Sequence, residues 1–228
     1  MKYFPMFINT QDRRIIIVGG GEQAAQKYRL AKKTSAEIIV ASPVLDDELA
    51  FCAEKGLITH HNTAINAALF KDTAMVFIAS GCRAIDACAH AIAKSVGAMV
   101  NVVDTQDLCD IITPAIIDRD PVVVAIGTEG NAPVIARQIK SKIEQSLEPD
   151  LGEFVGLIGN LRSTVKKYIA PAQQRNFWRW VFSGKPRKLF RSGEKAEAMK
   201  LVKKQISSDI PLNDKNNTKS SHVEIVGA

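Results

Sequence analysis

The sequence predicts an α/β fold: a Rossmann-like parallel sheet, then a hairpin and a helix, then a small all-helical region. Apolar strand segments alternate with helical segments up to about residue 104, at the spacing of βαβ units. A glycine-rich turn joins the first strand directly to the first helix. From residue 151 onward the pattern is helical only.

The first strand and its glycine turn organise the chain. Residues 15–18 are β-branched, which is typical of a strand buried on both faces. They lead into Gly19-x-Gly21-x-x-Ala24, a pattern found between strand and helix in dinucleotide-binding domains. Gly19 allows the tight turn, Gly21 lets the backbone approach a pyrophosphate, and Ala24 allows close packing. The free N–H groups of a helix beginning at Glu22 favour a phosphate, although such a turn can also bind nothing.

The following segments continue the alternation of strands and helices. The expected strands are 37–41, 57–61, 74–79 and 98–103, and the expected helices are 22–33, 45–55 and 83–95. Strands at 111–117 and 122–126 lie so close in sequence that we expect an antiparallel hairpin. The remaining expected helices are 132–147, 151–169, 172–182 and 187–206.

Composition is typical of a globular protein with a core. Hydrophobic residues make up 46% of the chain, and no segment approaches the roughly 20 apolar residues of a membrane span. The amino terminus lacks the features of a signal peptide. The four cysteines form no Cys-x-x-Cys pair, which is typical of thiols in a reducing compartment. We therefore expect a cytoplasmic protein without a membrane partner.

The net charge of +6 is unevenly distributed. Between Arg162 and Lys204, thirteen Lys or Arg residues stand against two acidic residues. Such a basic segment attracts polyanions. Nucleic acid, a small molecule with several carboxylates and a plain solvated helical face remain open as interpretations. Residues 177–182, which alternate aromatic and basic character, are interpreted either as helix core or as an apolar wall edged by cations.

Asn101-x-x-Asp104 lies at the carboxyl end of the expected strand 98–103, at the edge where open α/β sheets place their chemistry. A carboxylate at Asp104 can act as a general acid or base, or it can cap the next turn. Thr128, in the glycine-bearing loop before the helix at 132, can contact an anion or cap a turn. Where many such domains carry an acid for the ribose, this chain has Ser42 and Pro43, so the sequence favours NAD over NADP without deciding between them.

The histidines and cysteines do not have the spacing of a closed metal site. His60 and His61 are neighbours on a strand and point to opposite faces. Cys88 and His90 are two residues apart on a helix, which places them on different faces. If the protein handles a metal, the bound ligand must supply the donor atoms.

Taken together, these motifs resemble the precorrin-2 dehydrogenase/sirohydrochlorin ferrochelatase family, which includes the amino-terminal half of the siroheme synthases. The resemblance extends from residue 1 to about residue 205. The matching segments are 4–7, 17–21, 101–104, 113–119, 124–126, 132–137, 161–162 and 177–178.

The resemblance implies a homodimer whose active-site cleft lies between subunits and is closed by a helical domain. The implied regions are an NAD-binding Rossmann-like domain at 1–113, a dimerisation region at 114–150, a helical domain at 151–206 and a tail or linker at 207–228. Residues 223–228 resemble the first strand and glycine turn of the methyltransferase domain in fused siroheme synthases.

The resemblance also implies an enzyme that oxidises precorrin-2 to sirohydrochlorin with NAD and then inserts Fe2+ to give siroheme. Iron is then a substrate, not a metal bound by the protein. Asp104 would serve both reactions, with Asn101 and Thr128 contacting the tetrapyrrole; relatives usually have serine at the position of Thr128. The residues expected to bind NAD are Gly19, Gly20, Gly21, Glu22, Gln23, Ser42, Pro43 and Val44.

The substrate implied by the resemblance carries eight carboxylates, which gives the basic helical segment a purpose without nucleic acid. Two alternatives remain open. One is a dehydrogenase without chelatase activity, which the threonine at position 128 keeps open. The other is a dinucleotide-sensing regulatory module whose basic helical end contacts another macromolecule.

Overall fold

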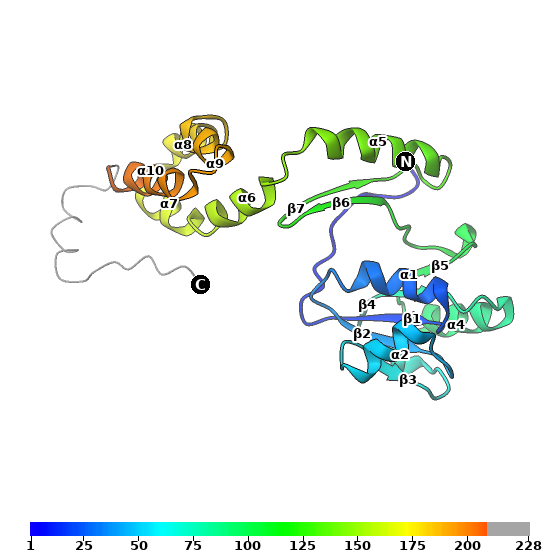
Figure 1. Ribbon diagram of the computed structural model, residues 1–228. Helices are drawn as coiled ribbons and strands as arrows, with labels where there is room; N and C mark the ends of the chain where they lie inside the picture. The colour runs from blue at the N-terminus through cyan, green and yellow to red at the C-terminus, as the bar shows by residue number, and fades with distance from the viewer. Residues whose placement is uncertain (209–228) are drawn as a thin grey trace. The chain divides into compact units, whose positions relative to one another are not determined.

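The computed structural model describes residues 1–208, which divide into two compact units (Figure 1). The sheet unit comprises residues 1–115 and 127–137. Within the described residues, the helical unit comprises 116–126 and 138–208. The strand and glycine turn expected at 223–228, and most of the expected tail, lie outside the described residues.

The sheet unit is built on a five-stranded parallel sheet with the strand order β3-β2-β1-β4-β5. Its strands are β1 (Arg14–Val18), β2 (Glu37–Ala41), β3 (Thr59–His61), β4 (Thr73–Ile78) and β5 (Val100–Val102). The strand order reverses at β1, which pairs with both β2 and β4. The carboxyl ends of β1 and β4 therefore border the crevice in which open α/β sheets bind ligands.

Helices cover both faces of this sheet. Ile15 and Ile17 of β1 pack into one buried cluster with α1 (Glu22–Ala31) and α2 (Asp47–Glu54). Ile16 and Val18 pack into a second cluster with α3 (Ala67–Phe70) and α4 (Arg83–Ser95). The prediction that the first strand is buried on both faces is thus confirmed. The short helix α3, capped by Asn66, is absent from the sequence-based expectations.

The segment between β5 and the hairpin differs from the prediction of a strand over 111–117. The N–H groups of Asp110 and Ile111 both donate to Val100 O, and Asn101 Nδ2 donates to Ile111 O. Asp110 and Ile111 are therefore tied to the first two residues of β5 (Val100–Val102), after a 3-10 turn at η1 (Gln106–Leu108). The strand begins only after Pro114, as β6 (Ala115–Arg119). It forms the expected two-stranded sheet with β7 (Val122–Ile126).

The predicted all-helical region is confirmed, but two of its expected helices are each divided into two. The helices are α5 (Pro133–Ser146), α6 (Leu151–Gly159), α7 (Arg162–Tyr168), α8 (Pro171–Ser183), α9 (Lys185–Arg191) and α10 (Lys195–Ser208). The expected helix 151–169 breaks at Asn160 and Leu161. The expected helix 187–206 breaks at Gly193, whose φ of +88° is a left-handed conformation that ends a helix. Each break lets a short apolar face turn into the common core of Phe154, Phe190 and Val202.

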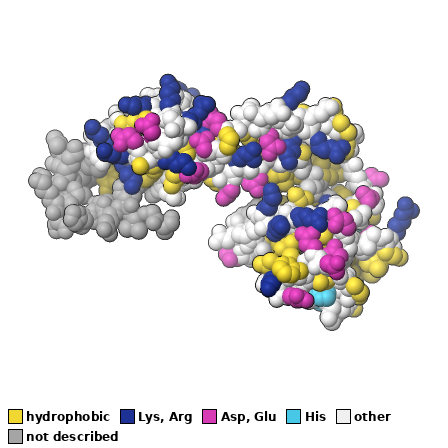
Figure 2. Space-filling view, in the orientation of Figure 1, with side chains coloured by type: hydrophobic (Ala, Val, Ile, Leu, Met, Phe, Trp, Pro, Cys, Tyr) yellow, Lys and Arg dark blue, Asp and Glu magenta, His cyan; other side chains and the backbone are white. Residues whose placement is uncertain are grey.

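Part of the basic segment is neutralised within the helical unit. Arg187 is 7% exposed, pairs with Glu148 and Asp150, and lies 4.8 Å from the Phe154 ring centroid. Burial opposes its charge, but the two carboxylates raise the pKa of Arg187 above its usual value. Figure 2 shows acidic side chains among the basic ones over these helices. The +11 of this segment therefore overstates the charge that it offers to an external ligand.

Asp110 fastens the segment that follows β5. Its carboxylate accepts hydrogen bonds from Lys94 Nζ at 2.8 Å and from Val100 N at 3.1 Å. Burial alone would raise the pKa of Asp110, but these two hydrogen bonds lower it below its usual value. Because the pKa in the folded protein is below that of the unfolded chain, the ionised carboxylate stabilises the fold at neutral pH.

We predict that Asp110→Ala lowers the melting temperature at pH 7 by about 2–4 °C, through the loss of these hydrogen bonds. As pH falls below about 4 and then through the lowered pKa, Asp110 of the wild type becomes protonated. The difference in melting temperature should therefore shrink, which calorimetry between pH 7 and pH 3 would measure. A difference that stays constant with pH would contradict the role of the ionised carboxylate.

Candidate functional site

Backbone at the glycine turn is in close contact with two other loops. Gly19 has a φ of +124°, and a Cβ there would lie 2.2 Å from Ala79 O. A Cβ at Gly20 would lie 1.9 Å from Val44 O. A Cβ at Gly21, in contrast, would meet nothing within 4 Å. Gly19 and Gly20 therefore hold the loops together, while Gly21 faces open space.

That open space lies at the start of α1. Gly21 is the N-cap residue, and no described side chain caps the helix. The N–H of Ala25 makes the bond to Gly21 O, at 3.0 Å, so the N–H groups before it have no partner within the helix. These N–H groups and the helix dipole favour an anion. The uncapped helix start and the space at Gly21 fit the pyrophosphate of a dinucleotide.

Residues 42–44, which the sequence predicts as a second segment contacting NAD, lie directly beside the glycine turn. Ser42 Oγ donates to Val44 O at 2.7 Å, and the N–H of Asp46 donates to Gly20 O at 2.7 Å. The backbone of Ser42 is in turn held by His60 and His61 of β3. The carboxyl end of β2 is thus ordered against the glycine turn, with Pro43 and Val44 exposed.

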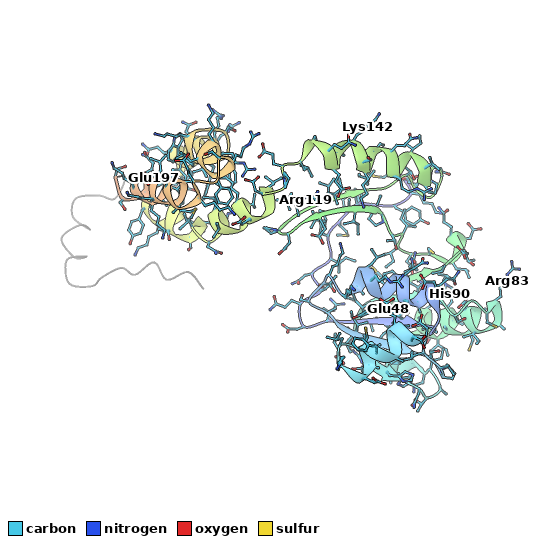
Figure 3. All side chains as sticks on the ribbon, in the orientation of Figure 1. Glu48, Arg83, His90, Arg119, Lys142 and Glu197 are labelled. Carbon is cyan, nitrogen blue, oxygen red and sulfur yellow. The ribbon has the colours of Figure 1, made fainter. Side chains whose placement is uncertain are left out.

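Glu22 lies exposed in the first turn of α1 and is paired with a cation. Arg29 lies on α1 two turns after Glu22. It forms ion pairs with Glu22 and with Glu48 of α2, and Glu48 is labelled in Figure 3. The hydrogen bond from Arg29 lowers the pKa of the Glu22 carboxyl below its usual value. Arg29 therefore offsets an acidic charge that would otherwise repel an anion at the helix start.

Asp104 and Gln23 are 81 residues apart in sequence, yet their side chains meet. Gln23 Nε2 donates to Asp104 Oδ2 at 3.0 Å. Asp104 has a φ of +58°, a left-handed conformation that asparagine and aspartate tolerate better than most residues. Within residues 1–208, no N–H of the following turn bonds this carboxylate; Thr105 N donates to Val102 O instead. The geometry thus favours an available carboxylate over a turn cap.

Asp104 lines a pocket of about 420 Å³ at the carboxyl end of β5. Asn101, also in its lining, is 7% exposed and ties the pocket wall to Ile111 through its Nδ2. Asn101 Oδ1 is buried and has no hydrogen-bond partner among the described residues. Asn101 therefore retains one acceptor without a partner in this part of the chain, and this oxygen is buried in the structure. A buried acceptor without a partner is costly unless a ligand or solvent satisfies it.

The loop that carries Thr128 reaches the same pocket. Gln106 of η1 donates from Nε2 to Glu129 O at 2.7 Å. From this loop the pocket lining includes Gly130, not Thr128, whose carbonyl accepts a bond from Asn131 N at 2.9 Å. The structure thus brings Thr128 close to the pocket but not into its lining.

Lys27 and Cys109 also line the pocket, although neither is among the site residues predicted from the sequence. Lys27 lies four residues after Gln23 on α1, so both share one helix face; this spacing was the available signal. Burial lowers the pKa of Lys27, while the nearby Cys109 and Asp104 raise it. Burial raises the pKa of the Cys109 thiol, whose sulfur contacts the N–H of Val102. Cys109 belongs to no sequence motif from which its place in the pocket could have been predicted.

Residues 1–208 contain no group of three or more His, Cys, Asp or Glu side chains arranged to hold a metal ion. His90, on α4 in Figure 3, does not line the pocket. In the same residues, no helix is both long enough and apolar enough to cross a membrane.

Two protein-family models match the chain. One is described as putative NAD(P)-binding and matches residues 6–115. The other is described as the sirohaem synthase dimerisation region and matches residues 150–206. The second model therefore matches residues in helices α6 to α10, whereas the family resemblance implied a dimerisation region at 114–150.

Curated relatives and a solved structure are similar to the chain. The siroheme synthase of Neisseria meningitidis serogroup C is 33% identical over 229 residues, covering 100% of this chain and 46% of the relative. The siroheme synthase of Stutzerimonas stutzeri is 34% identical over 212 residues, covering 92% of this chain and 46% of the relative. The chain thus spans about half the length of these relatives. The structure of SirC, precorrin-2 dehydrogenase, has the same fold, with a TM-score of 0.71, 16% identity, and coverage of 89% of this chain and 100% of that chain.

The glycine turn provides a matched pair of variants. Gly19→Ala should destabilise the fold by about 2–5 kcal/mol, because its Cβ would overlap Ala79 O at a strained φ. Gly21→Ala should cost less than about 1 kcal/mol, since its Cβ enters open space at an N-cap. That same open space leads us to expect weaker dinucleotide binding by Gly21→Ala. Urea denaturation and dinucleotide titration would measure both effects, and equal destabilisation by the two variants would refute this description of the turn.

Proposed function

The chain belongs to the family formed by the amino-terminal part of the siroheme synthases, and from this we propose that it is an NAD-dependent precorrin-2 dehydrogenase that also inserts Fe2+ into sirohydrochlorin. The observation that carries the proposal is the hydrogen bond between Gln23, in the first turn of α1, and Asp104, at the end of β5. This bond connects two parts of the proposed site. One is the start of α1, which would bind the cofactor, and the other is the Asp104 carboxylate, which would move protons.

In this proposal NAD is bound by the residues around the glycine turn. The N–H groups at the start of α1 hold the pyrophosphate, and Gly21 leaves room for it. The segment of Ser42, Pro43 and Val44 holds the adenosine ribose. Arg29 is engaged by two carboxylates, which supports NAD rather than NADP because it is not available for a 2′-phosphate. The nicotinamide, when bound, supplies the acceptor for a hydride.

Asp104 is proposed as the general base of the dehydrogenation. Conversion of precorrin-2 to sirohydrochlorin removes one hydride and one proton, and the proton passes to Asp104 Oδ1. Gln23 holds the other oxygen, Oδ2, and so fixes the direction of the carboxylate. Asn101 Oδ1, which has no hydrogen-bond partner among the described residues, accepts a hydrogen bond from the tetrapyrrole. Thr128 contacts the tetrapyrrole from the neighbouring loop.

Insertion of iron is proposed for the same pocket. Fe2+ is a substrate, and the four nitrogen atoms of the macrocycle are its ligands in the product. Two pyrrole N–H protons must leave as the metal enters, and Asp104 can accept them one after the other with solvent exchange, because its side chain is exposed.

We also propose that the chain acts as a cytoplasmic homodimer. Val134, Ile135 and Ile139 of α5 are 39–56% exposed, and apolar side chains at such density on one helix favour an interface. The matched dimerisation model lies on 150–206, so we assign dimerisation to α5 together with the helices that follow it. In this proposal residues 1–113 bind the cofactor, and the regions 114–150 and 151–206 (the helical domain) both contribute to dimerisation.

A dehydrogenase without chelatase activity is the second candidate. Thr128 carries a methyl group beyond the serine that the family usually has, and Gly130 instead of Thr128 lines the pocket. Both features would change the position of the macrocycle during metal insertion. They would have less effect on the removal of a proton in the dehydrogenation.

The first experiment tests both activities. The purified protein is mixed anaerobically with precorrin-2, with and without NAD, and its visible spectrum is followed before and after Fe2+ is added. We expect sirohydrochlorin only with NAD, and then siroheme faster than in a protein-free control. Sirohydrochlorin without accelerated metal insertion would support the second candidate. The absence of any NAD-dependent change would refute the proposed function and direct attention to a regulatory module.

Asp104→Asn is the sharpest single test of the site. Asparagine tolerates the left-handed backbone at this position and still accepts a hydrogen bond, but it cannot take up a proton. We expect the dehydrogenase rate to fall about 100- to 10,000-fold while NAD affinity is retained. Asp107→Asn, an exposed aspartate on the adjacent η1 turn, is the matched control. Equal rates in both variants and the wild type would exclude Asp104 as the general base.

A further inference from the structure

Lys27 lies in the wall of the candidate active-site pocket without a role in the mechanism above. It follows Gln23 by one helical turn on α1, and Asp104 lines the same pocket. Gln23 bonds Asp104. Because Lys27 is four residues after Gln23, the same face of α1 carries both side chains.

The ammonium group is only weakly compensated by its surroundings. Its polar contact is Thr113 Oγ1 at 3.5 Å, and it lies 5.3 Å from the centroid of the Phe77 ring. It forms no ion pair with any residue of the described part of the chain. Burial lowers the pKa of Lys27 below its usual value. A partly desolvated cation of this kind gains most from a carboxylate that enters the pocket.

Some other lysines of the described residues have an acidic partner already. Lys94 pairs with Asp110 at 2.8 Å, and Lys195 pairs with Glu153 at 2.6 Å. Both lie on the surface, where such pairs contribute little. Lys27 is the contrasting case, because its charge faces a pocket and forms no ion pair with any carboxylate of the described residues, although Asp104 lies near enough to raise its pKa.

We propose that Lys27 is a substrate-binding residue that holds one carboxylate of the substrate beside Asp104. This inference rests on the proposed function, in which the substrate carries several carboxylates. The Thr113 hydroxyl, next to the ammonium group, can donate to the second oxygen of that carboxylate. A fixed carboxylate restricts how the macrocycle sits, so that its reacting carbon faces Asp104.

Lys27 also has an electrostatic effect on substrate entry. A substrate with several negative charges is repelled by the carboxylate of Asp104, and the positive charge of Lys27 in the same pocket offsets that repulsion. The pyrophosphate of NAD is the other anion near α1, but it is assigned to the N–H groups at the helix start, one turn before Lys27. The tetrapyrrole, not the dinucleotide, is therefore expected to depend on Lys27.

The test compares Lys27→Met, which keeps the length of the side chain and removes its charge, with Lys27→Arg, which keeps the charge. Lys32→Met, an exposed lysine at the end of the same helix, is the matched control. Anaerobic titration with sirohydrochlorin, without NAD, measures tetrapyrrole affinity by absorbance. We expect Lys27→Met to bind about tenfold or more weakly than the wild type, Lys27→Arg to recover much of that loss, and Lys32→Met to match the wild type.

Two further measurements separate binding from folding. NAD affinity should be unchanged in all three variants. The melting temperature of Lys27→Met without ligand should equal or exceed that of the wild type, because a poorly compensated charge has been removed. Unchanged sirohydrochlorin affinity in Lys27→Met, or a loss of affinity for NAD alone, would overturn the inference. A lower melting temperature with unchanged affinity would show that Lys27 is structural. Failure of the wild type itself to bind sirohydrochlorin would instead refute the proposed function.

Discussion

The close backbone contact at Gly19 and Gly20 is the constraint on which the site depends. Any Cβ at these positions would overlap the carbonyl of Ala79 or of Val44. Three loops can therefore converge at the carboxyl edge of the sheet: the glycine turn after β1, the segment after β2 and the segment after β4. The start of α1 is left uncapped at their junction, where its N–H groups can bind an anion.

The other half of the site depends on a second set of contacts, at the end of β5. Hydrogen bonds of Asn101 and Asp110 hold residues 109–111 against this strand. They shape the pocket in which Asp104 lies, and the bond from Gln23 connects that pocket to α1. One negative and one positive side chain, Asp104 and Lys27, share it. Such a pocket can both move a proton and attract an acidic ligand.

The helical unit depends on a buried ion pair cluster as well as on apolar packing. Arg187 joins α9 to the segment of Glu148 and Asp150 while lying over the ring of Phe154. A further contact is made by α6, where a Cβ at Gly152 would lie 2.1 Å from Arg119 O in the hairpin. The basic composition of this region thus serves its own fold in part, and only the remainder is available to an acidic partner.

The sequence by itself determined the parallel sheet, the glycine turn, the hairpin and the candidate carboxylate Asp104, because each follows from local periodicity or from a motif at fixed spacing. The tertiary structure alone decided that residues 111–114 follow β5 and do not extend β6. It also decided that Lys27 faces the pocket of Asp104. The physical reason is that these features arise from side-chain hydrogen bonds between different elements, such as Asn101 with Ile111, 10 residues apart, and Gln23 with Asp104, 81 residues apart. No local pattern of hydrophobicity records such contacts.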